Sequence, residues 1–177
     1  MDMIRPAAND RRDALYAEAA AALSPAIARL ARALEADTDR ARDLEQDVHV
    51  ELWRSFAGFD GRCTLKTWTW RVAHNVAASH VARAKRGIRT VALDEAAEAI
   101  ADADTERAFH DGQALARIHA LIAVLKPADR SVILLYLEDL DAAAIGEITG
   151  LSPGNVAVKI HRIKALLTRR FAAGAPV

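Results

Sequence analysis

Hydrophobic residues recur along this chain at spacings of three and four, the period of an amphipathic α-helix. In residues 40–56 they fall at strict i+4 spacing, at Leu44, Val48, Leu52 and Phe56. In residues 67–86, one face carries Trp68, Val72 and Val76. No stretch shows the strict alternation of a half-buried strand, and alanine, the strongest helix former, is abundant. The pattern predicts an all-α protein.

Local signals divide the first half into helices. Residues 11–23 form one, and Ser24-Pro25 is expected to end it and open a second to about residue 35, because proline favours the first helical position. Residues 37–39 interrupt the pattern, and Asp37 or Asp39 could cap the next helix. A glycine-bounded turn, residues 58–61, precedes the helix at 67–86.

The second half repeats these signals. Residues 114–125 form an apolar-faced helix, and Pro127 opens another that runs to about residue 137. Asp141 caps a short helix at 142–149, Gly150 ends it, and Ser152-Pro153 opens a last helix to about residue 171. The intervening pattern dissolves into small and acidic residues, with room for a short helix at 94–101. We expect two small helical domains, 11–88 and 112–173, joined by a flexible acidic linker, 89–111.

Charge is segregated although the formal net charge is zero. Residues 35–51 carry a net charge of −5 and residues 94–111 one of −6. Residues 62–89 contain seven cations and no acid, and no acid follows Glu147. Two basic blocks separated by acidic ones suggest two surfaces that face nucleic acid.

Several classes of protein are excluded. The N-terminus lacks the apolar core of a secretory signal, and no run reaches the roughly 18 apolar residues that span a bilayer, so we expect no membrane insertion. The single cysteine, Cys63, cannot form an internal disulfide, which agrees with a cytoplasmic protein. The histidines lack metal-ligand spacing, and neither a phosphate-binding glycine loop nor a nucleophile elbow occurs. We therefore expect no enzyme, metal or cofactor.

Residues 140–170 have the form of a helix-turn-helix, with glycine in the turn and Ser-Pro opening the second helix. In this motif the second helix enters the major groove, and residues near its N-terminus contact the base edges. Its outer face carries Asn155, Lys159, Arg162 and Arg169, side chains of the kinds that read adenine and guanine. The alternative is an ordinary antiparallel helix pair, which the acid-free C-terminal block disfavours.

Three stretches in this order resemble the bacterial sigma-70 family, in the small extracytoplasmic-function type that keeps only regions 2 and 4. They are ARDLEQDVHVELW at 41–53, the segment 59–75 with its Thr67-Trp68, Trp70 and Ala73-His74-Asn75, and residues 140–164. The resemblance covers most of the chain, about residues 15–171. The resemblance implies that core RNA polymerase and promoter DNA are partners, with an anti-sigma factor as a third.

The resemblance also implies roles for individual residues. Polymerase would bind a surface formed by Leu44, Gln46, Asp47 and Trp53. The turn 59–65 would capture a base flipped out of the −10 element, and the opened strand would lie on neighbouring side chains; this −10 set is Phe59, Arg62, Lys66, Trp68, Arg71, Asn75, Arg83 and Arg86. Region 4 would read the −35 element through Ser152, Asn155, Lys159 and Arg162.

Departures from the family pattern affect the promoter sequence rather than the role. Asn155, Ala157 and Val158 stand where the family usually has threonine, a basic residue and serine, so the duplex-reading helix is less cationic than most. Whether Trp68 lies wholly in the core stays open, and the two halves could pack together and mask both basic faces. The main alternative function is a stand-alone helix-turn-helix regulator, and another is an interaction-only helical protein.

Overall fold

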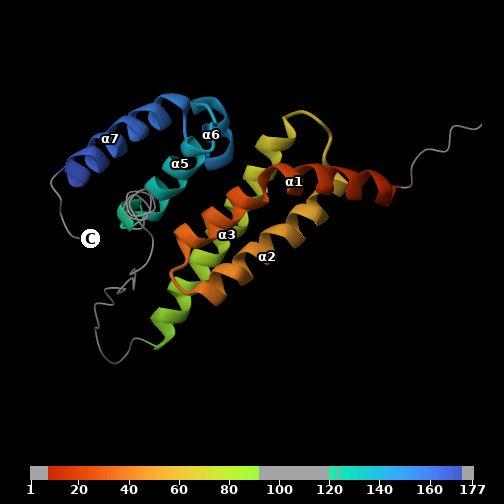
Figure 1. Ribbon diagram of the computed structural model, residues 1–177, viewed down its shortest axis with the longest axis horizontal. Coiled ribbons are helices and arrows are strands. Elements are labelled where there is room, and N and C mark those ends of the chain that lie inside the picture. The colour runs from red at the N-terminus through yellow and green to blue at the C-terminus, as the bar shows by residue number, and fades with distance from the viewer. Residues whose placement is uncertain (1–7, 92–119, 123, 173–177) are drawn as a thin grey trace, which may run out of the picture.

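The computed structural model describes residues 8–91, 120–122 and 124–172, and every regular element within them is a helix (Figure 1). The predicted all-α class is confirmed. The elements are α1 (Ala8–Leu34), α2 (Thr38–Ser55), the 3-10 turn η1 (Phe56–Gly58), α3 (Leu65–Val91), α5 (Pro127–Leu137), α6 (Ala142–Thr149) and α7 (Pro153–Ala172). The helix expected at 94–101 lies outside the described residues, and of the one expected at 114–125 only residues 120–122 are described as helical.

The helix α1 is continuous, so the break expected at Ser24-Pro25 is wrong. Proline inside a helix removes one backbone hydrogen bond and usually kinks or breaks it. Here Pro25 is exposed, and the hydroxyl of Ser24 donates to the carbonyl of Ala20 at 2.7 Å. The apolar side of α1 stays in register through this point, because Leu23 packs against the same core that buries Ile27. Packing of this side outweighs the lost bond.

The other helix ends follow their local signals. Asp37 caps α2 by accepting hydrogen bonds from the backbone N–H groups of Asp39 and Arg40, at 3.0 and 2.9 Å. The bond from Arg40 lowers the pKa of the Asp37 carboxyl. Asp141 caps α6 through the N–H of Ala144 at 2.8 Å, and Gly150 ends it in the left-handed conformation, at φ 76°. These three caps confirm the sequence predictions.

The first three helices pack into a bundle whose core holds Ile27, Leu44, Val48, Leu52 and Ala73. The helices α5, α6 and α7 form the second unit (Figure 1). Within the second unit a separate small cluster joins Ile122, Ile133 and Ile163.

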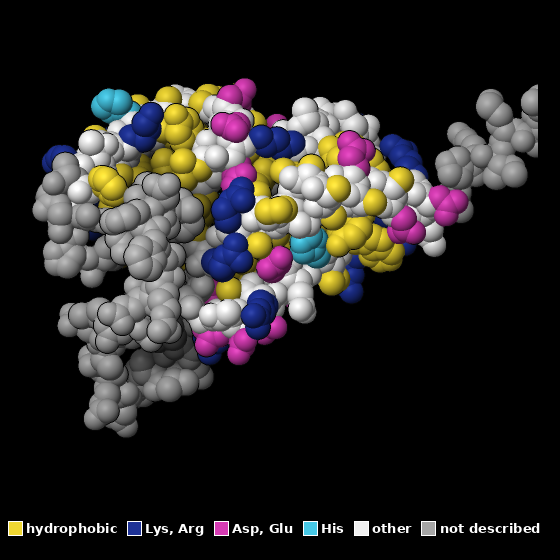
Figure 2. Space-filling view, in the orientation of Figure 1, with side chains coloured by type: hydrophobic (Ala, Val, Ile, Leu, Met, Phe, Trp, Pro, Cys, Tyr) yellow, Lys and Arg dark blue, Asp and Glu magenta, His cyan; other side chains and the backbone are white. Residues whose placement is uncertain are grey.

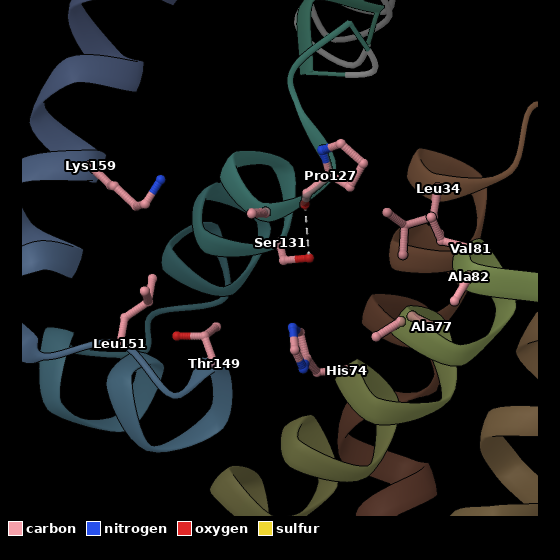
Figure 3. A pocket seen from close by; sticks show the side chains of 12 residues that line it. Leu34, His74, Ala77, Val81, Ala82, Pro127, Ser131, Thr149, Leu151 and Lys159 are labelled. Carbon is pink, nitrogen blue, oxygen red and sulfur yellow. Dashed lines mark hydrogen bonds between the residues drawn. The ribbon is translucent and has the colours of Figure 1, made fainter. Parts of the chain in front are cut away.

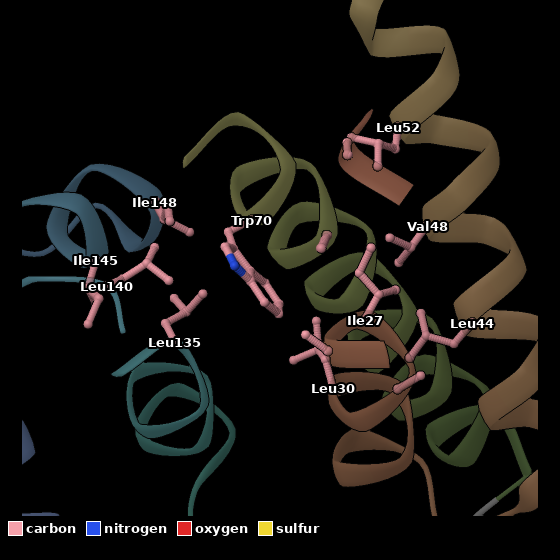
Figure 4. Close-up of a cluster of buried hydrophobic side chains, with 14 of the residues drawn as sticks. Ile27, Leu30, Leu44, Val48, Leu52, Trp70, Leu135, Leu140, Ile145 and Ile148 are labelled. Atoms are coloured by element: carbon pink, nitrogen blue, oxygen red, sulfur yellow. The ribbon is translucent and has the colours of Figure 1, made fainter. Parts of the chain in front are cut away.

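The two units share one hydrophobic core. Trp70 of α3 is only 1% exposed, and its indole lies between Ile27 and Leu30 on one side and the α5–α6 side chains on the other (Figure 4). Those side chains are Leu135 of α5, Leu140 of the segment between the two helices, and Ile145 and Ile148 of α6. The helices α3 and α6 are in direct contact, so the second unit rests on the basic helix of the first.

Candidate nucleic-acid interface

An aromatic platform forms where the turn after η1 meets α3. The Phe59 ring lies edge-on to Phe56 and to Trp68, with ring centres 6.0 and 5.3 Å apart. The Trp68 indole donates to the hydroxyl of Ser55 at 3.0 Å, which ties the start of α3 to the end of α2. Trp68 and Phe59 are both half-buried, so Trp68 is not wholly a core residue. Partly exposed aromatic rings are suited to stacking on unpaired bases.

Polar side chains extend from this platform along α3. Arg71, Asn75 and Arg83 follow one another at multiples of four residues, and Asn75 and Arg83 are exposed. Arg83 lies 3.8 Å from Asp47 of α2. These residues form a polar stripe that a strand could follow from the aromatic platform.

The remaining members of the −10 set fall elsewhere. Arg62 is exposed in the turn, 3.0 Å from Asp60. Lys66 and Asn75 are nine residues apart, two and a half helical turns, and project from opposite sides of α3. The side chain of Arg86 lies outside the description, although its backbone is helical.

Arg71 is already engaged by the second unit. Its guanidinium forms an ion pair with Glu147 of α6 and lies 5.7 Å from the centre of the Trp68 ring. Arg71 is half-buried, with 31% of its side chain exposed. A carboxylate therefore occupies the position at which this arginine would meet a phosphate. This contact joins the two candidate DNA-binding units directly.

The helix α7 presents a different set of side chains from the one expected. Ser152 accepts a hydrogen bond from the N–H of Asn155 at 3.3 Å and so caps the helix. Asn155 and Arg162 are exposed on the outer face. Lys159 is instead half-buried and lies 2.5 Å from Asp129 of α5. The expectation that Lys159 lines the outer face is therefore wrong, because its ammonium group pairs with a neighbouring helix. Val158, to which the sequence assigned no binding role, is exposed on that face.

The acidic side of α2 is solvent-facing. Gln46 and Asp47 are exposed. Trp53 is half-buried, because its indole donates to Asp13 of α1 at 2.8 Å and the Arg12 guanidinium lies 3.5 Å above its ring. Leu44 differs from the other three members of the set, since it is 1% exposed and belongs to the core. Its assignment to a binding surface is corrected: it holds α2 in place from inside.

A cavity of about 420 Å³ lies at the junction of the two units (Figure 3). His74 and Ala77 of α3 face Ser131 of α5 and Thr149 of α6 across it. Burial lowers the pKa of His74, and a hydrogen bond with Asn75 opposes that shift. The Nδ1 atom of His74 is buried with no hydrogen-bond partner among the described residues. The sequence does not predict that His74 lines a cavity, because the cavity exists only when both units meet.

Charge is mixed on the face that Figure 2 presents. Lysine and arginine side chains alternate there with aspartate and glutamate. The basic blocks of the sequence thus do not merge into one positive patch on this side. Within the described residues, no group of three or more histidine, cysteine, aspartate or glutamate side chains could hold a metal ion. Nor does any described helix combine the length and apolarity needed to cross a bilayer.

Family models match both halves of the chain. The model described as Sigma-70 region 2 matches residues 20–87, and the model described as Sigma-70, region 4 matches residues 115–167. The first match contains the aromatic platform and the acidic face of α2. The second contains α5, α6 and most of α7.

Curated relatives of the chain are named as RNA polymerase sigma factors. The ECF RNA polymerase sigma factor SigE of Mycolicibacterium smegmatis is 31% identical over 139 residues, which cover 77% of this chain and 53% of the relative. The chain therefore spans about half the length of SigE. The RNA polymerase sigma-H factor of Pseudomonas aeruginosa is 28% identical over 142 residues, covering 75% and 74% of the two chains.

Two solved structures share the fold. One is the sigma factor RpoE in complex with the anti-sigma factor NepR from Bartonella quintana, with a TM-score of 0.69, 20% identity, and coverage of 87% of this chain and 94% of that one. The other is CnrH in complex with the cytosolic domain of CnrY, with a TM-score of 0.66, 21% identity, and coverage of 95% and 94%. At these identities the likeness speaks for the fold alone.

Proposed function

Because the chain belongs to the sigma-70 family, in its extracytoplasmic-function type, we propose that it is a sigma factor that binds bacterial core RNA polymerase and directs promoter-specific transcription initiation. The observation that carries the proposal is the pairing of two basic helices, α3 and α7, with an exposed acidic face on α2, all within the segments that the family models match. A sigma factor performs no catalysis of its own, so each surface is assigned a binding role.

The proposed polymerase contact is the exposed face of α2, with Gln46 and Asp47 at its centre and Trp53 beside them. The side chains of Gln46 and Asp47 are exposed and lie outside the core, so substituting them removes contacts without disturbing packing. Leu44 supports this face from beneath and is proposed to act only through the position of α2.

The proposed −10 contact is the aromatic platform with the polar stripe of α3. A base that leaves the duplex loses its stacking partners, and aromatic side chains replace them at about 1–3 kcal/mol each. Phe59 and Trp68 supply the rings. Asn75 and Arg83 lie further along the helix, where the rest of the strand would pass.

The proposed −35 contact is the outer face of α7. Its helix N-terminus, capped by Ser152, favours a phosphate, and Asn155 and Arg162 are placed to reach base edges in the major groove. Residues 11–88 and 112–173 are the proposed units of regions 2 and 4, with 89–111 as the linker. We propose a cytoplasmic location, where core polymerase works. We also propose an anti-sigma factor as a regulatory partner, since the complex of RpoE with the anti-sigma factor NepR has the same fold.

The proposal is tested by mixing the purified chain with core RNA polymerase and following co-migration on a sizing column. The wild type should co-migrate, and the double substitution Gln46→Ala with Asp47→Ala should abolish it. Glu18→Ala is the matched control, because Glu18 is an exposed acid on α1 outside the proposed contact. Absence of co-migration with intact duplex binding would instead favour the stand-alone regulator.

A further inference from the structure

Val158 is the most exposed of the large apolar side chains in the part of the chain that the structure describes. Its exposed fraction is 58%, compared with 46% for Val50 and 54% for Val124. It is the sixth residue of α7, within the first two turns. Val156 and Ile163 are buried on the inner side of the same helix, so Val158 points outward. A single exposed valine is ordinary on a protein surface, so exposure alone assigns it nothing.

The side chains next to Val158 on α7 indicate a role for this residue. Asn155 lies three residues before it and Arg162 four residues after it, so the three side chains form one row on the outer face. Gly154 and Ala157 are small and exposed, and they leave Val158 uncovered. The ammonium group of Lys159, the next residue, is directed to Asp129 of α5. The outer face therefore offers an amide, an apolar group and a guanidinium in succession.

This order matches the chemistry of a major groove. Asparagine pairs with adenine and arginine with guanine, while the C5-methyl of thymine is contacted by apolar side chains. We propose that Val158 reads a thymine in the duplex through contact with its 5-methyl group and is thus a specificity-determining residue of α7. The inference rests on the proposed function, because it requires α7 to enter a major groove.

The test uses deoxyuridine, which differs from thymidine by that methyl group alone. The full chain, assembled with core RNA polymerase, first selects its preferred duplex from a random library. Each thymine of the selected site is then replaced singly by deoxyuridine. At one thymine the wild type should lose about fourfold in affinity, the equivalent of about 0.8 kcal/mol for one buried methyl group.

The variant Val158→Ala should bind the thymine duplex about as weakly as the wild type binds the deoxyuridine duplex, with no further loss at deoxyuridine. The matched control is Val124→Ala, which shortens a valine of nearly equal exposure outside α7 and should behave as wild type. A selected site without a methyl-sensitive thymine would overturn the inference, as would a Val158→Ala variant that keeps the full deoxyuridine penalty.

Failure of the proposed function would look different. If the wild type does not assemble with core polymerase, the sigma-factor proposal fails, and the same selection on the chain alone still tests Val158. If the chain selects no duplex sequence in either form, α7 does not read DNA and both proposals fall. If it selects a sequence whose thymines are all insensitive, only the role of Val158 is lost.

Discussion

Single residues on one helix can have opposite tasks, and α2 shows this within three positions. Leu44 is 1% exposed and contributes to the core, whereas Gln46 is exposed to solvent. Periodicity alone assigns Leu44 to the core stripe, while the family motif places both residues on one binding surface. Burial decides between the two interpretations and separates residues that hold α2 from residues that α2 presents.

The separation predicts different losses for two substitutions. Leu44→Ala should lower the free energy of unfolding by about 2–5 kcal/mol, because it removes buried methyl groups and leaves a cavity. Gln46→Ala should change the free energy by no more than about 0.5 kcal/mol and still weaken polymerase binding. Urea denaturation of both variants measures the first quantity. Equal stability of the two variants would show that Leu44 is not a core residue in solution.

Among the elements, α1 departs most from its local signal, because Pro25 lies inside a helix that continues to Leu34. Pro25→Ala should therefore raise the free energy of unfolding, by up to about 3 kcal/mol, since it restores a backbone donor in the helix interior. Pro127→Ala is the matched control: Pro127 opens α5, where its N–H would be unpaired anyway, so no gain is expected. Thermal denaturation compares them, and an equal gain in both would contradict this account of α1.

The helix-turn-helix contains one close backbone approach that only glycine permits. A Cβ atom at Gly146 would lie 2.6 Å from the carbonyl oxygen of Leu151, which lies in the turn between α6 and α7. Gly146→Ala should shift α7 against α6, lower stability by about 1–3 kcal/mol and reduce duplex binding. Gly154→Ala, whose added methyl would meet no atom within 4 Å, is the control for the packing effect alone, because Gly154 lies beside the proposed DNA-reading row of α7. Circular dichroism melts and a duplex-binding assay report both effects.

Local sequence signals predict the helix ends but not the features that depend on packing between helices. Asp37, Asp141 and Gly150 act on their own helix ends through hydrogen bonds or a single dihedral angle, and the sequence predicts them correctly. The fate of Pro25 depends on packing against other helices. The position of Lys159 depends on Asp129, thirty residues away on α5. Neither interaction has a period or spacing that a sequence could display.

In the whole molecule, the two halves are joined by packing and by an ion pair that neither half could make alone. Trp70 lies in a core shared by α1, α3, α5 and α6, and Arg71 meets Glu147 across the same junction. The hypothesis that packing of the halves masks both basic faces is corrected in part: Arg71 is occupied, whereas Asn75, Asn155 and Arg162 stay exposed. The sequence predicts two helical units but not this junction, because its two surfaces lie about 70 residues apart.

The junction must open if both promoter elements are read at once. Elements named −10 and −35 lie about 25 base pairs apart, or about 85 Å at 3.4 Å per pair. Helices α3 and α7 are both in contact with α6, which is far too close for that span. Residues 92–119, between the described halves, can reach about 95 Å when fully extended. The chain thus has the length to read both elements after its halves separate.

Opening should be easier when Arg71 is released. Glu147→Gln removes the charge that holds Arg71, so single-stranded DNA should bind more tightly and the separated form should become more populated. The effect should be modest, at most about 1 kcal/mol, because the pair is partly exposed. Energy transfer between dyes at Ala22 and Ala165, with Cys63 replaced, reports the separation. Glu51→Gln is the control, since its partner Arg54 lies on the same helix; an equal response there would exclude a role for the junction.

The same junction should respond to acid through His74. Burial in the cavity lowers the pKa of His74 below its ordinary value of 6.5, so the packed form binds a proton less readily than a separated form in which water reaches the ring. The population of the packed form should therefore be greatest above about pH 6.5. It should decrease as the pH falls from there towards the lowered pKa of His74. Other charged groups also lie at this junction. They are Lys159 with its partner Asp129, the Arg71–Glu147 and Arg29–Glu138 pairs, and Arg130, which donates to the carbonyl of Ala33.

The dyes at Ala22 and Ala165 can follow this titration between about pH 5 and 8. Energy transfer should fall on acidification in the wild type, and His74→Gln should remove that dependence, because a neutral amide gains no proton on separation. The control is His161→Gln, on the exposed side of α7, in which energy transfer should depend on pH as it does in the wild type. If His74→Gln kept the full pH dependence, the response would not come from His74, and this account of the junction would be wrong.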